Sequence, residues 1–372
     1  MKIALNATSL NERPSGARQR FLGIYGELVA RLPDTEFVIY EPADCRVASW
    51  FGDASNVSVR RTPVPSEGRL QKMLHGARYW SAALSRERFD VVESLTLPIL
   101  KAPTGRMLLT IHDIRMAHRK YGGAGQALYR YILRKSLDAA DHVIAVSEAM
   151  KTELLDFYPG KPISVVHNGL DASAFDQIPL DALALVRKRL ALPQQFVLTV
   201  GHFEKRKNHL LLVDAMARLR QRGDSCPLVI VGNDSGEMRA VENRIRATGS
   251  SDHVHLLSGL SDHEVRCLYK LCSLFVFPSL YEGFGIPILE AMAADRPMAL
   301  SDIPVFKEIT QGQGFFFDPD DAESMAVAIE RALGSSSERA RMLEHGRRRL
   351  RDFAFQALAG QVERLYRTLA TN

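Results

Sequence analysis

The feature that most constrains the fold of this chain is a regular alternation of short apolar runs with longer segments of helical periodicity. Short apolar runs bounded by turn residues are typical of parallel strands buried on both faces, and the amphipathic segments between them supply the crossover helices. Six such runs lie in the first half of the chain, at 2–6, 36–40, 90–94, 107–111, 142–146 and 163–167. Six more lie in the second half, at 196–200, 227–231, 253–257, 273–277, 297–301 and 314–317. The alternation predicts an α/β protein built on doubly wound parallel sheets.

The two series of strands are separated by residues 168–195, which begin with turn residues and contain no strand pattern. Because 372 residues exceed what one hydrophobic core usually organises, we expect the boundary between two domains in this segment. We predict a first domain over 1–172, a second over 173–351, and an amphipathic helix within 352–372. Open parallel sheets bind ligands beyond the carboxyl ends of their strands, so residues directly after the strands are the candidates for a site.

Composition and cysteine spacing exclude several classes of protein. The chain is 46% hydrophobic and 24% charged, which is typical of globular proteins and unlike disordered or collagen-like chains. A net charge of +5 is too small to indicate nucleic-acid binding. No disulfide framework or zinc site is predicted, because no C-x-x-C pair occurs among Cys45, Cys226, Cys267 and Cys272. No apolar run approaches the roughly 18 residues of a membrane span, so we expect a cytoplasmic or peripheral membrane protein.

Most of the basic excess lies in the first half of the chain, and part of it is concentrated between Ile114 and Leu137. This stretch contains no acidic residue and three interleaved tyrosines. Its basic residues are Arg115, Arg119, Lys120, Arg130, Arg134 and Lys135. Such a stretch is compatible with a solvated helix face, and also with a surface that meets anionic lipid headgroups or an anionic acceptor.

Residues 277–294, FPSLYEGFGIPILEAMAA, place a glycine-containing loop between an apolar strand and a helix with Pro287 near its first turn. Glycines permit close approach of a ligand, and the N-terminus of a helix attracts anions. The backbone N–H groups available to a phosphate are those of Gly283, Phe284, Gly285 and Ile286. Glu282 precedes the loop and Glu290 follows it, and carboxylates there would suit hydroxyl groups on either side of a phosphate. Taken singly, Glu282 is better explained as a turn residue and Glu290 as a surface residue of the helix. Taken together, the two glutamates favour a nucleotide-sugar site.

Glu282 and Glu290, with seven residues between them, resemble the paired-glutamate motif of the retaining glycosyltransferases of family 4. The resemblance implies a GT-B fold, in which two Rossmann-like domains face each other across a cleft and a C-terminal helix, here 352–372, crosses back to the first domain. It also implies that Glu290 binds the ribose of a nucleotide sugar and that Glu282 contacts the transferred sugar. Its motifs are stronger in the second half of the chain than in the first.

A second resemblance lies in VLTVGHFEKRKNHLLLVDAM, residues 197–216. A departing nucleoside diphosphate accumulates negative charge in the transition state, and a fixed cation stabilises that charge. The family places a lysine for this purpose in a pattern similar to Gly-x-x-Glu-x-Arg-Lys-Asn, which assigns the role to Lys207, with Arg206 in support. Many members carry arginine where this chain has His202, and Arg206 is the candidate to compensate for that departure.

The remaining family positions are weaker matches. His112 follows the strand 107–111 and matches a histidine that approaches the donor sugar, so we expect it to stabilise the transition state or orient the sugar. Gly16, in the first loop, matches a glycine near the leaving phosphate. Gly259 and Leu260 match the turn that meets the base through backbone groups. Arg18 and Arg20 lie in the same loop as Gly16. They are equally well explained as residues that bind a phosphate of the acceptor and as residues of a solvated loop.

Asp318, Pro319 and Asp320 form an acidic pair of the kind that holds a divalent ion in metal-dependent sugar transferases. They stand directly before a helical pattern, and Asp320 or Asp321 as the N-cap of that helix explains them better. We therefore predict no catalytic metal and no other cofactor.

These motifs predict a retaining hexosyltransferase that uses a nucleotide diphosphate sugar. The HFEKRKN variant resembles bacterial mannosyltransferases of O-antigen and lipopolysaccharide assembly, so GDP-mannose or a related GDP-sugar is the expected donor. The expected acceptor is a glycan or lipid-linked glycan at the cytoplasmic face of the inner membrane. A UDP-sugar-dependent transferase, a nucleotide-sugar epimerase and an inactive nucleotide-sugar-binding subunit remain alternatives. A dehydrogenase is disfavoured because no strand is followed by G-x-G-x-x-G.

Overall fold

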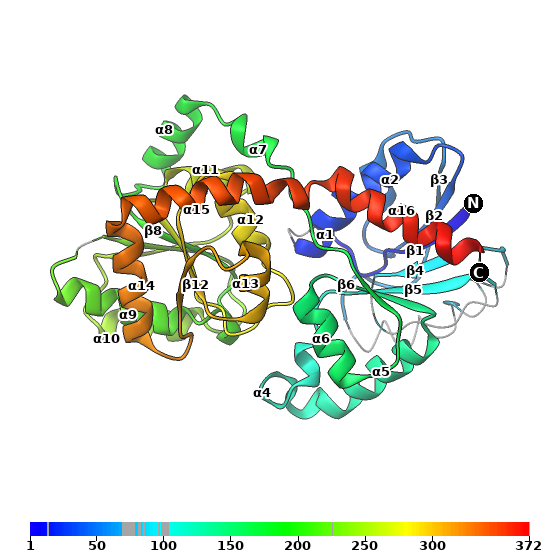
Figure 1. Ribbon diagram of the computed structural model, residues 1–372, viewed down its shortest axis with the longest axis horizontal. Helices are drawn as coiled ribbons and strands as arrows, with labels where there is room; N and C mark the ends of the chain where they lie inside the picture. The colour runs from blue at the N-terminus through cyan, green and yellow to red at the C-terminus, as the bar shows by residue number, and fades with distance from the viewer. Residues whose placement is uncertain are drawn as a thin grey trace. The chain divides into compact units, whose positions relative to one another are not determined.

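The computed structural model describes residues 1–12, 15–68, 79–80, 83–84, 86–95, 97, 104–224 and 226–371. The chain divides into two compact units (Figure 1). The first unit comprises Met1–Leu170 with Phe353–Asn372, and the second comprises Asp171–Asp352. The boundaries predicted after residues 172 and 351 lie close to these divisions. Each unit contains one parallel sheet, so the α/β fold class predicted from the alternating pattern is confirmed.

The described strands of the first unit form one parallel sheet in the order β3-β2-β1-β4-β5-β6-β7. They are β1 (Lys2–Asn6), β2 (Glu36–Glu41), β3 (Val57–Arg61), β4 (Val91–Ser94), β5 (Arg106–Ile111), β6 (His142–Ala145) and β7 (Ile163–Val165). In the register of the sheet, Leu5 of β1 lies opposite Ile39 of β2 and Glu93 of β4. The chain reverses its direction of winding between β1 and β4, which is the switch point where such sheets bind ligands.

The sequence pattern did not indicate β3. This strand lies at the edge of the sheet, and in its sequence VSVRR polar residues alternate with valines. Val59 is 43% exposed, because one face of this edge strand is open to solvent. The prediction depended on continuous apolar runs, which mark strands buried on both faces and miss an edge strand of this kind.

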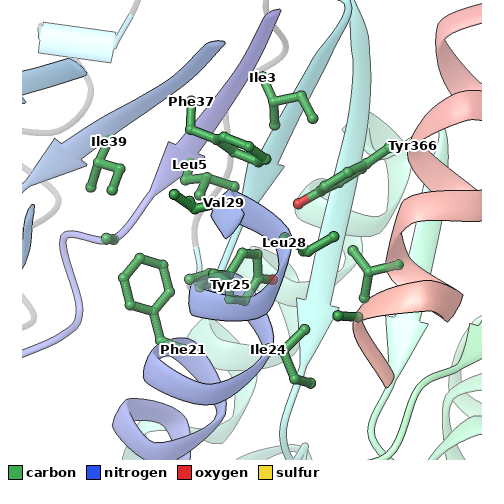
Figure 2. Close-up of a cluster of buried hydrophobic side chains, with 14 of the residues drawn as sticks. Ile3, Leu5, Phe21, Ile24, Tyr25, Leu28, Val29, Phe37, Ile39 and Tyr366 are labelled. Atoms are coloured by element: carbon green, nitrogen blue, oxygen red, sulfur yellow. The ribbon is translucent and has the colours of Figure 1, made fainter. Parts of the chain in front are cut away.

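The helices of the first unit lie on both faces of its sheet, with α2 and α16 on one face and α5 and α6 on the other (Figure 1). They are α1 (Gly16–Arg20), α2 (Gly26–Arg31), α4 (Arg119–Gly122), α5 (Gln126–Ala139), α6 (Glu148–Phe157) and α16 (Phe355–Thr371). The C-terminal helix α16 buries Leu358, Val362 and Tyr366 against the core of this unit, as its amphipathic pattern predicted. Figure 2 shows the Tyr366 side chain beside the cluster that contains Ile3, Tyr25 and Leu28.

A buried carboxylate ties α16 to the sheet. Glu93 of β4 is fully buried, and its Oε1 accepts hydrogen bonds from the hydroxyls of Tyr25 at 2.5 Å and Thr110 at 2.6 Å. The Tyr366 hydroxyl donates to Oε2 of the same carboxylate. A buried carboxylate is tolerated only where its oxygens are hydrogen-bonded, so these three hydroxyls are what allow Glu93 to occupy the core.

The described strands of the second unit form a parallel sheet in the order β10-β9-β8-β11-β12-β13. They are β8 (Val197–Val200), β9 (Leu228–Val231), β10 (Val254–Leu257), β11 (Leu274–Phe277), β12 (Met298–Ser301) and β13 (Phe315–Phe317). Its helices are α7 (Ser173–Asp176), α8 (Leu180–Arg189), α9 (His209–Gln221), α10 (Met238–Ala247), α11 (Asp262–Leu271), α12 (Ile286–Ala293), α13 (Pro304–Thr310), α14 (Ala322–Gly334) and α15 (Ser336–Arg349). Here the winding reverses between β8 and β11, which places the ligand-binding edge at the carboxyl ends of these two strands.

Two local predictions about helix ends in the second unit are confirmed. Pro287 lies in the first turn of α12, two residues after the N-cap Gly285, whose positive φ of 155° favours glycine. Asp321 is the N-cap of α14, and its side chain accepts from the backbone N–H of Glu323 at 2.8 Å. Among the described residues, no group of three or more His, Cys, Asp or Glu side chains is arranged to hold a metal ion. Each helix in these described ranges is too short or too polar to span a bilayer.

Candidate functional site

A cluster of four charged side chains lies at the carboxyl ends of β8 and β11. The Nζ of Lys207 is 2.7 Å from Oε1 of Glu282, and it also lies over the ring of Phe277, 4.9 Å from its centroid. Lys207 is only 8% exposed. It is the last residue of a short helical turn, Lys205–Lys207, which lies between β8 and α9. The ammonium is therefore held by one carboxylate and one aromatic face.

Arg206 connects the two carboxylates of this cluster. Its Nη1 lies 2.6 Å from Oε1 of Glu282, and its Nη2 lies 2.6 Å from Oε1 of Glu204. Nη1 also donates to the carbonyl of Tyr281 at 3.3 Å, and the backbone N–H of Leu280 donates to the carbonyl of Arg206 at 2.7 Å. These contacts join the loop after β8 to the loop after β11.

The two cations control the ionisation of Glu282. Burial by itself would favour the neutral acid, but Lys207 and Arg206 outweigh it and lower the pKa of Glu282 to about 2. The carboxylate is therefore ionised at every working pH. The sequence predicted Lys207 and Glu282 as contacts for two different parts of a ligand, and the structure brings the two side chains into direct contact.

The glycine loop that follows Glu282 leads directly into α12. Gly283, Phe284 and Gly285 are buried, and a Cβ added at Gly285 would lie 3.2 Å from the ring of Phe306. The loop can therefore present backbone N–H groups at the start of a helix while its other side is packed against the core. This arrangement suits a phosphate beside the two cations.

Glu290 lies farther along α12 and differs from Glu282 in its electrostatic surroundings. Burial raises the pKa of Glu290 to about 7, and Asp262 adds to the rise, while the Tyr269 hydroxyl and Arg266 oppose it. The two glutamates are therefore in different states near neutral pH: Glu282 is fully ionised and Glu290 is about half protonated. A carboxyl group of this kind can accept hydrogen bonds from vicinal hydroxyls and can also donate one.

The loops after β9 and β10 lie along the same edge of the sheet. Gly259 follows β10 with a positive φ of 68°, and its backbone N–H donates to Oδ1 of Asn233 at 3.1 Å. Leu260 is half-buried beside it. Sequence reasoning had identified Gly259 and Leu260 but missed Asn233, although its position two residues after β9 was a usable signal.

The first unit contains the candidate residues His112, Gly16, Arg18 and Arg20. His112 follows β5 directly, and burial lowers its pKa to about 3, with the Arg20 guanidinium adding to the effect. The imidazole is therefore neutral and can act as a hydrogen-bond donor or acceptor. Gly16 begins α1, which Ser15 caps by accepting from the backbone N–H of Arg18 at 3.2 Å.

Arg20 is not a solvated loop residue. It is 1% exposed, and its Nη1 donates to the carbonyls of Val166 at 2.9 Å and His167 at 2.7 Å and to Oδ1 of Asn168 at 3.2 Å. Arg20 therefore holds the segment after β7 in place. Arg18 lies over the ring of Trp50, with its guanidinium carbon 5.0 Å from the centroid.

The basic stretch after β5 includes α5, which has one face packed on Phe157 and another exposed to solvent. Arg130 and Arg134 of α5 both lie over the ring of Phe157, at 4.8 and 4.9 Å from its centroid, and Arg130 also donates to the carbonyl of Ala117. On the outer face of α5, Leu128 is 55% and Tyr131 is 60% exposed. The stretch thus combines cations that pack on the protein with an exposed apolar face.

Comparison with known proteins shows which families the chain resembles. Residues 23–174 match the family described as Glycosyltransferase Family 4, and residues 185–349 match the family described as Glycosyl transferases group 1. O-antigen chain mannosyltransferase RfbU of Salmonella typhimurium is 30% identical over 63% of this chain and 62% of its own length. O-antigen chain mannosyltransferase B of Escherichia coli is 26% identical over 71% of each chain. The chain thus spans about two thirds of the length of these curated relatives.

The fold is shared with solved structures that have little sequence identity. Anabaena Alr3699/HepE, crystallised in complex with UDP and glucose, aligns with a TM-score of 0.78 at 17% identity, covering 99% of this chain and 100% of that one. A glycosyltransferase from Rickettsia africae aligns with a TM-score of 0.77 at 18% identity, covering 100% of this chain and 99% of that one. The predicted two-domain architecture is therefore confirmed at the level of the fold.

Proposed function

The chain belongs to family 4 of the glycosyltransferases with the GT-B fold, and on this basis we propose that it transfers a hexose from a nucleotide diphosphate sugar to a hydroxyl acceptor with retention of configuration. The observation that carries the proposal is the contact of Lys207 and Arg206 with Glu282, at 2.7 and 2.6 Å, beside the glycine loop that begins α12. A buried and a half-buried cation near the start of a helix suit a leaving diphosphate, and the carboxylate between them suits a sugar hydroxyl.

Each candidate residue has a role in this proposal. The acceptor oxygen bonds to the anomeric carbon as the bond from that carbon to the diphosphate oxygen breaks, and the departing diphosphate takes the acceptor proton. Lys207, Arg206 and the N–H groups of the loop stabilise the charge on the diphosphate. Glu290 accepts from the ribose hydroxyls and Glu282 from the transferred sugar. The remaining contacts are assigned to His112 for the sugar, Gly16 for the leaving phosphate, and Gly259 and Leu260 for the base.

We propose mannose as the transferred sugar and a GDP-sugar as the donor. Two relatives described as O-antigen chain mannosyltransferases support this assignment. A UDP-sugar is the second candidate, because the structurally similar HepE was crystallised with UDP and glucose. No metal enters the proposed reaction, since the cations of the cluster supply the charge that a metal would otherwise provide.

A thermal-shift panel of GDP, UDP, ADP and dTDP tests the donor site. A ligand that binds only the folded protein raises the melting temperature, by an amount that grows with its concentration relative to Kd. We expect GDP to give the largest rise. A larger shift with UDP would change the donor assignment, and the absence of a shift with all four nucleotides would contradict the proposed function.

The ionisation of Glu290 predicts a pH dependence of donor binding. If the ionised carboxylate is the form that binds the ribose hydroxyls, a pKa of about 7 means that donor affinity rises as the pH increases through neutrality. Between pH 6 and pH 8 the ionised fraction rises about tenfold, so the KM for the donor should fall by up to that factor. The profile of KM against pH, measured for the native protein and for Glu290→Gln, provides the check. The variant should show a flat profile, and the same slope in both proteins would remove Glu290 from this role.

We propose a lipid-linked glycan at the cytoplasmic face of the inner membrane as the acceptor, with the outer face of α5 against the lipid. The exposed Leu128 and Tyr131 would insert among headgroups, and Arg134 and Lys135 would attract anionic lipid. Arg130 is a poor choice for mutation, because its contacts with Phe157 and Ala117 are internal to the protein.

Sedimentation with vesicles tests this surface. The double variant Leu128→Ser/Tyr131→Ser should lose most of its binding to vesicles that contain phosphatidylglycerol, whereas vesicles of phosphatidylcholine alone should bind neither protein. Leu185→Ser, at a leucine of the second unit that is 67% exposed, is the matched control and should bind as the native protein does. Equal binding of the double variant and the native protein would contradict the proposal.

A further inference from the structure

The strand ends at one side of the second sheet are linked by a chain of hydrogen bonds that centres on His202. His202 lies two residues after β8, and the backbone N–H of Asn233, after β9, donates to its Nδ1 at 3.2 Å. The carboxamide Oδ1 of Asn233 accepts in turn from the backbone N–H of Gly259, after β10. Because β8, β9 and β10 are neighbours in the sheet, the chain of hydrogen bonds runs along its carboxyl edge.

The hydrogen bond from Asn233 decides which nitrogen of His202 carries the hydrogen. A backbone N–H can only donate, so Nδ1 must be the unprotonated nitrogen that accepts. In the neutral ring, the hydrogen therefore lies on Nε2. The backbones of the two loops are joined by a second hydrogen bond, in which the N–H of Phe203 donates to the carbonyl of Asn233 at 2.9 Å. The amide that contacts Nδ1 of His202 is thus itself fixed against the loop that carries this ring.

The surroundings keep this ring neutral. Burial lowers the pKa of His202 and Lys207 lowers it further. Glu204 opposes this with a smaller effect than that of Lys207, and Arg206 adds the smallest contribution to the lowering. The side chain is nevertheless exposed, and within the described parts of the chain no acceptor engages its Nε2. A neutral N–H donor is therefore presented beside the two cations of the charged cluster.

We propose that His202 binds the diphosphate of the nucleotide-sugar donor through its Nε2–H, as a neutral hydrogen-bond donor whose tautomer is selected by the backbone amide of Asn233. The proposal rests on the proposed function, because it needs a diphosphate at Lys207 and Arg206. At this place His202 contributes a directional hydrogen bond to a phosphate oxygen and no charge. The same chain of hydrogen bonds connects this contact to Gly259, the residue assigned to the base.

Two substitutions separate the two nitrogens of the ring. The oxygen of His202→Asn can take the place of Nδ1 as the acceptor for Asn233, but the variant has no group at the position of Nε2. The amide of His202→Gln can reach the position of Nε2 and restore an N–H donor there. The probes are GDP and UDP, with guanosine and uridine as the controls that lack phosphate, and calorimetric titration gives each Kd.

We expect His202→Asn to raise the Kd of the preferred nucleoside diphosphate about tenfold, which is the effect of losing one hydrogen bond to a charged group. The Kd of His202→Gln should stay within about threefold of that of the native protein. Nucleoside binding should be the same in all three proteins. Native affinity in His202→Asn, equal losses in both variants, or equal losses for nucleoside and diphosphate would overturn the proposal. If the native protein binds neither GDP nor UDP, it is the proposed function that fails, and this inference fails with it.

Discussion

Replacing Lys207 by alanine is expected to lower kcat by about 10²- to 10³-fold, since the removal of one preorganised group that stabilises transition-state charge has effects of this size. The ammonium of Lys207 is buried and 2.7 Å from Glu282, so in the proposed reaction it would act on the diphosphate with little solvent to screen its charge. The charge on the diphosphate grows as the bond to the sugar breaks. The loss should therefore fall mainly on kcat, with a smaller change in the KM for the donor.

The matched control is Lys205→Ala. Lys205 lies two residues away in the same short turn, but its side chain is 86% exposed and its nearest partner is Glu237 at 4.0 Å. The two variants are compared by their initial rates of sugar transfer. Where no acceptor has been identified, the rate of slow donor hydrolysis is measured instead. Similar rates for Lys207→Ala and Lys205→Ala would show that Lys207 does not stabilise the leaving group.

The substitution Glu282→Gln is expected to separate catalysis from nucleotide binding. Transfer should fall about 10²-fold, because the variant loses the carboxylate that is proposed to contact the transferred sugar. Binding of the nucleoside diphosphate alone should become tighter, because Lys207 and Arg206 no longer share their charge with Glu282. Calorimetric titration with GDP or UDP and initial-rate measurements provide the two readouts. A loss of diphosphate affinity in this variant would contradict the arrangement proposed for the cluster.

The same variant should be less stable than the native protein, because breaking a buried ion pair by removing one partner costs about 3–5 kcal/mol. The pKa of Glu282 is lowered from 4.5 to about 2, so its charge contributes stability above pH 4.5 that is lost as the pH falls toward 2. The difference in unfolding free energy between the two proteins should therefore shrink on the acid side. Glu237→Gln, in the pair with Lys205, is the control and should change neither property.

The sequence supported different parts of the fold to different degrees. Strands buried on both faces were found because each is a continuous apolar run, and β3 was missed because an edge strand alternates polar and apolar residues. The start of α12 was predicted from Pro287 and the glycines before it, since the conformational limits of these residues act locally. Arg20 gave no signal of burial, because its acceptors lie about 146 residues farther along the chain.

The sequence by itself determined the two α/β sheets, the glycine loop at the start of α12 and the residue types beside it. These features depend on periodicity and on the chemistry of near neighbours, which a linear chain displays. Tertiary structure alone decided that Lys207 contacts Glu282, 75 residues away, and that Asn233 selects the tautomer of His202, 31 residues away. Such contacts exist only where the ends of different strands meet, so they appear when the order of the strands in the sheet brings the loops together.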